Sequence, residues 1–184
     1  MSERLVAEAL RLNRRYVEEV VIGWDLCPWA ARAWLDGQVT QRVFVDAEPD
    51  AAGVAGFVDE LLARPDAAIG LAIFPRVAGT AAAWERFAES VRRMRGAFMI
   101  AAFHPDYRAP DGPLDAARLV PFIRRTPDPT LQLVRASLVD SLRGQVSADV
   151  GRANLATVSG RGPAELDALL ADIRRDRDAS YARG

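Results

Sequence analysis

The chain has 184 residues, of which 50% are hydrophobic and 27% are charged, as in an ordinary globular domain. Its net charge of −1 argues against general nucleic-acid binding, and no apolar run approaches the ~20 residues that span a bilayer. The N-terminus is polar and charged, unlike a secretory signal, and a single cysteine cannot form an internal disulfide. We therefore expect one soluble domain over residues 1–184, located in the cytoplasm, with neither a membrane nor a nucleic acid as partner.

Two absences exclude whole classes of enzyme. The chain has no lysine, and all 24 of its basic residues are arginine. This excludes a pyridoxal-phosphate Schiff base, a lysine nucleophile and a phosphate-binding loop that needs its lysine. The only histidine is His104, which excludes zinc, iron and copper sites that need two or more imidazoles. A cofactor that needs a single imidazole stays compatible with the sequence.

The first part of the chain predicts a helix, a loop and a strand. Apolar residues recur at helical spacing over residues 3–22, with Ser2 as the expected N-cap and Gly23 at the C-terminal end. Residues 24–37 are predicted to be rich in loops and to end in a short helix. Residues 38–45 alternate between apolar and polar side chains, which predicts a strand.

Helices and strands alternate through the middle of the chain. Helical spacing predicts helices over 53–63 and 80–95, and short apolar runs predict buried strands over 67–74 and 97–103. The segment 105–128 is rich in Pro, Gly, Asp and Arg and is predicted to be a long loop. Long loops in compact domains often carry function.

Two more helices are predicted over 129–143 and 163–177. The order strand–helix–strand–helix–strand is typical of right-handed crossovers, which make the strands parallel. The predicted fold is therefore an α/β domain with a small three-stranded parallel sheet flanked by about five helices. Ligands bind beyond the carboxyl ends of the strands in such sheets, and these ends are Asp46, Arg76 and His104.

Cys27 is the first candidate for chemistry, in the segment Leu26-Cys27-Pro28-Trp29. A cysteine between a helix and a proline can serve as a nucleophile or as a thiolate ligand. The alternative is a buried structural cysteine, since free cysteine is among the most buried residue types.

His104 and a group of arginines are the other candidates. His104 ends a predicted strand in the segment Phe103-His104-Pro105-Asp106-Tyr107, where it can act as a metal ligand or as an acid or base. The alternative is a histidine hydrogen-bonded in a turn. Arg124 and Arg125, with Arg135 further along, have guanidinium groups that suit carboxylates and phosphates. The alternative for them is a solvated basic loop.

Four segments together carry a family resemblance: Val17–Gly23, Leu26–Ala30, Phe103–Tyr107 and Arg125–Pro129. In combination they resemble a bacterial family, the domain of unknown function 1415. The resemblance covers roughly residues 15–145 and follows the order of the family's motifs. The family itself implies no reaction.

The chain departs from this family's pattern at five positions. Arg124 stands where the family usually has asparagine, and Thr126 and Asp128 replace a serine and a tyrosine. Gln132 occupies a position that is usually histidine, and Ala136 one that is usually glutamate. The resemblance therefore implies a diverged member that lacks the family's second histidine and has its own substrate.

A second resemblance, shorter and based on motif order, is to haem-dependent N-oxygenases, which include enzymes that hydroxylate a guanidino nitrogen. The similar segments are the Cys27-Pro28 turn, the His104-Pro105 strand end and the arginine pair after it. In those enzymes the histidine is an axial haem ligand and arginines neutralise the propionates. The resemblance thus implies haem as the cofactor.

The sequence therefore favours a haem-dependent oxidative enzyme, an oxygenase or peroxygenase-like protein that acts on a small polar metabolite and draws on an electron donor. His104 would ligate the iron. Arg124, Arg125 and Arg76 would pair with the propionates, and Tyr107 belongs to the same predicted cofactor site. The apolar walls would come from Trp24, Trp29, Phe74 and Phe103.

Other hypotheses stay open. A cofactor-free cysteine enzyme would use Cys27 as nucleophile, His104 as base and Asp106 or Asp25 to orient the imidazole, which requires the thiol within hydrogen-bond reach of His104. A non-catalytic module would use the same residues to bind haem, an anion or a protein. A zinc site from Cys27, His104 and a carboxylate is disfavoured, because zinc ligands normally come as close pairs in sequence. The exposed faces of the first and last helices could form a homodimer.

Overall fold

The computed structural model describes residues 2–94, 98–108, 114–136 and 147–183. Its strands are β1 (Val39–Val43), β2 (Ile69–Ile73), β3 (Phe98–Phe103) and β4 (Thr130–Arg135). Its helices are α1 (Ser2–Arg15), the π-helix η1 (Tyr16–Ile22), α2 (Ala30–Leu35), α3 (Ala51–Leu62), α4 (Ala81–Met94), α5 (Ala116–Ile123), α7 (Ser147–Arg161) and α8 (Pro163–Ala182).

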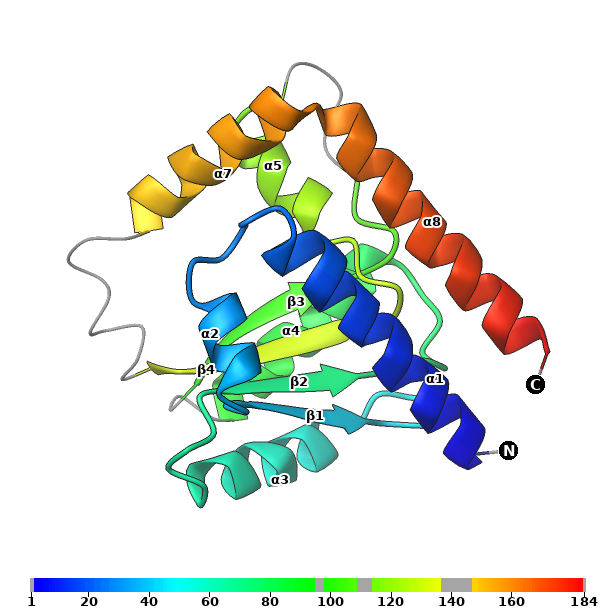
Figure 1. Ribbon diagram of the computed structural model, residues 1–184. Coiled ribbons are helices and arrows are strands. Elements are labelled where there is room, and N and C mark those ends of the chain that lie inside the picture. The colour runs from blue at the N-terminus through cyan, green and yellow to red at the C-terminus, as the bar shows by residue number, and fades with distance from the viewer. Residues whose placement is uncertain (1, 95–97, 109–113, 137–146, 184) are drawn as a thin grey trace.

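The strands form one mixed sheet in the order β1-β2-β4-β3. β1 and β2 are parallel, whereas β4 is antiparallel to both β2 and β3. β1, β2 and β3 therefore run in the same direction, and their carboxyl ends lie at one edge of the sheet (Figure 1). The predicted α/β class is confirmed, and the three predicted strands do run in one direction. The prediction of a three-stranded parallel sheet is wrong, because β4 lies between β2 and β3 with the opposite direction.

β4 occupies the first part of the segment 129–143, which was predicted to be a helix. Leu131 and Val134 have helical spacing, but Leu131 and Leu133 also alternate with Thr130 and Gln132. The fold uses this period of two, and both leucines are fully buried. The end of the predicted helix, from residue 137 on, lies outside the described residues.

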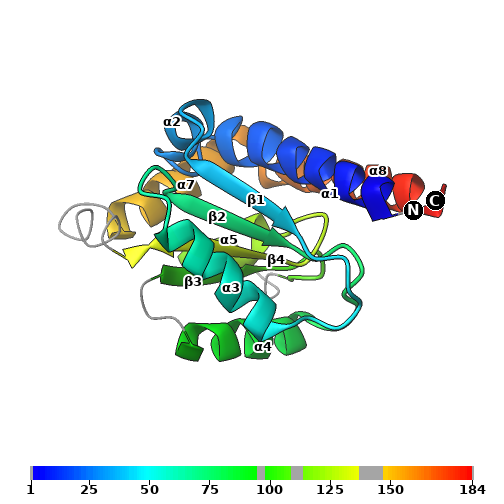
Figure 2. The ribbon, with the colours of Figure 1, turned by 90° about the horizontal axis from the view of Figure 1, so that it is seen from below.

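Helices cover both faces of the sheet, so the fold has three layers (Figures 1 and 2). α3 and α4 cover one face and form a core with the strands around Phe57, Trp84 and Phe98. α1, η1 and α2 cover the other face. A second core, which includes Tyr16 and Trp24, joins η1 to α5, α7 and α8.

The helix predicted over residues 3–22 is present but divided. α1 ends at Arg15, and the chain continues as a π-helix to Ile22. The helix ends at Gly23, as predicted. A Cβ atom at this glycine would lie 2.5 Å from the carbonyl oxygen of Glu19, so a larger residue would clash with the backbone. Helices of the π type are rare and occur frequently at functional sites.

Two helices of the structure were not predicted. α5 lies inside the segment 105–128, which was expected to be a loop. It begins after Asp115, whose carboxylate accepts a hydrogen bond from the backbone N–H of Arg118 at 2.9 Å. α7 has a weak apolar pattern and was missed as well. The last predicted helix, over 163–177, runs on to Ala182 as α8. None of the described helices is long and apolar enough to cross a membrane.

α8 lies beside α1, so both ends of the chain lie on the same side of the molecule (Figures 1 and 2). Charged pairs join the two helices. Asp176 of α8 accepts hydrogen bonds from Arg11 at 2.8 Å and from Arg15 at 2.7 Å. The hydrogen bonds from these guanidinium groups hold the pKa of the Asp176 carboxyl well below its ordinary value.

Candidate functional site: a cavity beneath the π-helix

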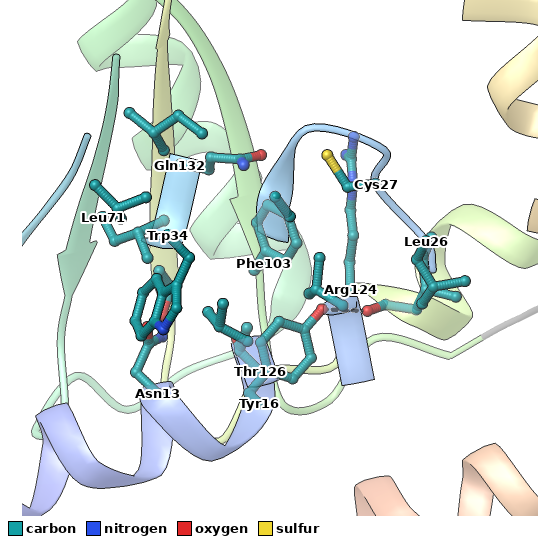
Figure 3. Close-up of a pocket in the computed structure, with 17 residues that line it drawn as sticks. Asn13, Tyr16, Leu26, Cys27, Trp34, Leu71, Phe103, Arg124, Thr126 and Gln132 are labelled. Carbon is teal, nitrogen blue, oxygen red and sulfur yellow. Dashed lines mark hydrogen bonds between the residues drawn. The ribbon is translucent and has the colours of Figure 1, made fainter. Parts of the chain in front are cut away.

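A cavity of about 190 Å³ lies between the helices η1 and α2 and the face of the sheet that they cover (Figure 3). Side chains from all four strands form its floor. In the part of the chain that the structure describes, 17 residues line the cavity; most are apolar or aromatic, and none is a carboxylate. This composition is typical of a site that takes up a small ligand. The more polar lining residues are Asn13, Cys27, Arg124, Thr126, Thr130 and Gln132.

Arg124 is the only charged side chain among the described residues that line the cavity. It follows the last turn of α5, where its backbone N–H donates to the carbonyl of Val120 at 3.2 Å. The central carbon of its guanidinium lies 5.4 Å from the centre of the Phe103 ring, which is cation–π geometry. Within the described parts of the chain, no carboxylate pairs with this guanidinium.

A buried ion pair fixes the loop that carries Arg124. Asp128 is 1% exposed and accepts hydrogen bonds from Arg177 Nε at 2.9 Å and from Tyr181 Oη at 2.6 Å, both on α8. Thr126 Oγ1 donates to the carbonyl of Asp128 at 2.7 Å. α8 therefore holds the loop from Arg124 to Asp128 at the edge of the sheet.

Cys27 is half-buried and lines the same cavity. The turn that carries it is held on both sides. Asn154 of α7 donates to the carbonyl of Leu26 at 2.8 Å, and the carbonyl of Cys27 accepts the N–H of Ala30 at 3.0 Å. Figure 3 draws Cys27 and Arg124 on one side of the cavity, opposite Asn13. The thiol thus shares a small cavity with a guanidinium group.

Gln132 and Asn13 add amide groups to the cavity, and the sequence had not marked either as a site residue. Gln132 projects from the middle of β4, and its amide has no hydrogen-bond partner among the described residues. Asn13 of α1 is 2% exposed and accepts a hydrogen bond from Gln41 Nε2 at 2.8 Å. Gln132 had been noticed only as a departure from the family pattern.

The π-helix forms part of the roof of the cavity through Tyr16, Val17 and Val21. The hydroxyl of Tyr16 donates to the backbone carbonyl of Ile123 at the end of α5, which ties the roof to the arginine loop (Figure 3). Burial raises the pKa of the Tyr16 hydroxyl, so it stays a neutral donor. No sequence signal marked this helix as π-type.

His104 does not line this cavity. It is 3% exposed, and its Nδ1 accepts a hydrogen bond from the backbone N–H of Asp106 at 3.1 Å. Phe103 points into the cavity, and successive residues of a strand point to opposite faces, so the residue after Phe103 turns away. Tyr107 lies against the His104 ring and donates from its hydroxyl to Glu85 of α4. Burial lowers the pKa of His104, which favours the neutral imidazole.

Asp106 and Arg125 pair with α8 rather than with the cavity. Asp106 lies 2.6 Å from Arg174, whose hydrogen bond lowers the pKa of the carboxyl. Arg125 pairs with Asp167 at 2.8 Å. Both residues therefore help to dock α8 on the loops beside it.

Arg76 and Arg135 also lie outside the cavity. Arg76 is exposed after β2 and lines a separate hollow beside Arg4 and Tyr181. Arg135 donates from Nε to the carbonyl of Ala67 at 2.8 Å, next to the end of α3. Of the residues predicted from the sequence, the cavity brings together Cys27, Phe103 and Arg124. His104 does not line it, and neither do the predicted wall residues Trp24, Trp29 and Phe74.

The residues present do not fit a haem. His104 is nearly fully buried and lines neither the cavity nor the separate hollow. The cavity that holds Arg124 is also smaller than the ~300–1,000 Å³ typical of pockets for larger ligands. In the described parts of the chain, no group of three or more His, Cys, Asp or Glu side chains could hold a metal ion. The haem hypothesis stays a prediction that this geometry does not support, and the zinc alternative gains no support.

Comparison with known proteins identifies one family. Its model, described as a protein of unknown function (DUF1415), matches residues 8–168. No curated protein and no solved structure gives a significant match. The resemblance to haem-dependent N-oxygenases is therefore not borne out. Since the matched region spans most of the chain and includes both Cys27 and Arg124, the chain belongs to the DUF1415 family.

Proposed function

We propose that the cavity binds a small carboxylate with a short apolar body, and that Arg124 pairs with the carboxylate. The observation that carries this proposal is that the guanidinium of Arg124 lacks a carboxylate partner within the described residues. Among these residues Arg124 is the only charged one that lines this mostly apolar cavity, and no carboxylate among them neutralises it.

Electrostatics explains why such an arginine favours a ligand. Arg124 is half-buried, and a charge that is partly removed from water gains from a partner, which the ring of Phe103 supplies only in part. The planar guanidinium can donate two parallel hydrogen bonds to a carboxylate. The apolar walls would meanwhile bury the hydrocarbon part of the ligand.

The volume of the cavity limits the size of the ligand. An engineered apolar cavity of about 150 Å³ takes up benzene. A cavity of about 190 Å³ therefore suits a ligand of roughly six to eight non-hydrogen atoms. Straight-chain acids such as pentanoate and hexanoate fall in this range.

This proposal keeps part of what the sequence suggested. The small-molecule partner and the anion-binding alternative are retained. The cysteine-enzyme alternative keeps its thiol in the cavity but has no support for His104 as its base, because His104 does not line the cavity. The electron donor, the homodimer and the cytoplasmic location stay predictions from sequence.

A binding titration tests the proposal. Isothermal titration calorimetry with hexanoate should show saturable binding to the unmodified protein, and hexanamide should bind more weakly because it carries no charge. Arg124→Gln should weaken hexanoate binding by roughly ten-fold, the lower end of the range for a hydrogen bond to a charged group.

Arg86→Gln is the matched control. Arg86 is exposed on α4, which covers the opposite face of the sheet, so its loss changes the net charge equally without touching the cavity. Its affinity for hexanoate should equal that of the unmodified protein. The proposal fails if hexanoate does not bind, if hexanamide binds as tightly, or if the two variants behave alike.

A further inference from the structure

Gln132 offers a second polar contact in the cavity, apart from Arg124. Its amide has no hydrogen-bond partner in the part of the chain that the structure describes. The amide is also not sealed inside the protein, because neither of its polar atoms is among the fully buried side-chain N and O atoms of the described residues that lack a hydrogen bond. An amide in this state is open to the cavity and can both donate and accept a hydrogen bond.

The strand register gives the backbone spacing beneath the two contacts. Arg124 lies over Phe103, and Phe103 pairs with Thr130 across β3 and β4. Gln132 is two residues along β4 from Thr130 and points to the same face, which is a step of about 7 Å. A ligand that spans this backbone step needs roughly four to six bonds between its two polar ends.

Apolar side chains form most of the floor around the two contacts, and the hydroxyl of Thr130, which also lies on the floor, donates to the carbonyl of Asp128 at 2.9 Å. Leu71 pairs with Gln132 on the neighbouring strand and lines the cavity beside it. Phe103 and Ile69 line the floor on either side of this row. A hydrocarbon chain would suit the space between the guanidinium and the amide, whereas a second charge would lack a partner there.

We infer that Gln132 is a specificity residue, and that the preferred ligand is a short aliphatic acid with a neutral hydrogen-bonding group at its far end, such as a hydroxyl. This inference rests on the proposed function and adds the second end of the ligand to it. Gln132 meets the neutral group, while Arg124 meets the carboxylate.

Two acids of equal size test the inference. 5-Hydroxypentanoate and hexanoate have the same number of non-hydrogen atoms and differ in a hydroxyl against a methyl group. Gln132→Met keeps the length of the side chain but cannot form the hydrogen bond. We expect this change to shift the ratio of the two dissociation constants by roughly ten-fold in favour of hexanoate, because the ligand's hydroxyl would then be buried unpaired.

A second variant covers the case in which Gln132→Met does not fold. Gln132→Asn keeps the amide but shortens the side chain by one methylene group, so the preferred ligand should change from 5-hydroxypentanoate to 6-hydroxyhexanoate.

The outcomes separate this inference from the function on which it rests. If hexanoate binds and needs Arg124, but the ratio stays within two-fold in Gln132→Met or the preferred length stays the same in Gln132→Asn, the role of Gln132 is overturned alone. If neither acid binds the unmodified protein, the proposed function falls and the inference falls with it.

Discussion

Arg124→Gln should reduce the preference of Cys27 for a charged alkylating reagent over a neutral one. Iodoacetate carries a carboxylate and iodoacetamide does not, and both react with the thiolate by displacing iodide. Cys27 is the only cysteine of the chain, so the modified site is unambiguous. Both Cys27 and Arg124 line the cavity, and the guanidinium should therefore attract iodoacetate to the thiol.

The size of the effect follows from the exposure of Arg124, which is half-buried. An ion pair at such a position is worth about 1 kcal/mol, since solvent screens it in part. This corresponds to about a five-fold change in relative rate. Any effect of Arg124 on the reactivity of the thiol itself cancels, because the same thiolate attacks both reagents.

Intact-protein mass spectrometry under pseudo-first-order conditions gives both rates. The ratio of the iodoacetate rate to the iodoacetamide rate should fall about five-fold in Arg124→Gln and stay unchanged in Arg86→Gln. A ratio that is the same in all three proteins would refute the reasoning, because it would mean that Arg124 does not act on anions in the cavity.

Two further predictions concern stability. Asp128→Ala should lower the free energy of unfolding by about 3–5 kcal/mol, because it leaves Arg177 without its buried partner, and roughly 6–20 °C in melting temperature should be lost. Asp178→Ala, which removes the exposed partner of the same arginine, should cost less than about 1 kcal/mol; equal losses in urea denaturation would contradict the burial argument. His104→Asn should flatten the pH dependence of stability, because burial lowers the pKa of His104 below 6.5. As the pH falls below that value, the unfolded chain takes up a proton before the folded chain does. The free energy of unfolding of the unmodified protein therefore falls by up to about 1.4 kcal/mol per pH unit, and the variant does not show this loss. If the free energy of unfolding falls equally in the unmodified protein and in His104→Asn between pH 7.5 and 5.5, the pKa of His104 is the same in the folded and the unfolded chain.

Local periodicity was enough to predict β1, β2 and β3 and the two helices, α3 and α4, that pack on one face of the sheet. Alternating or apolar runs predicted β1, β2 and β3, and helical spacing predicted α3 and α4 between them. β4 could not be recognised in the same way. Leu131, Val134 and Leu138 fit a helix as well as Leu131 and Leu133 fit a strand, and only pairing with β2 and β3 decides between them. Such pairing joins residues far apart in the sequence.

The candidate site was predicted in part. Cys27 and Arg124 were chosen for their chemistry, and the fold brings both to the cavity. His104 was expected beside them because it follows a strand, but a shift of one residue along a strand turns a side chain to the other face. The roles of Arg124 and Gln132 depend on what they do not contact, and a sequence cannot reveal the absence of a partner. The π-helical roof likewise has no sequence signature comparable to that of an α-helix.

A crystal structure of the protein grown with hexanoate tests the central claim most directly. The account predicts the carboxylate of the ligand within hydrogen-bond distance of the Arg124 guanidinium, with the alkyl chain on the floor near Leu71. A structure in which Arg124 pairs with a carboxylate of the protein itself, or in which the cavity stays closed to hexanoate at saturating concentration, would contradict it.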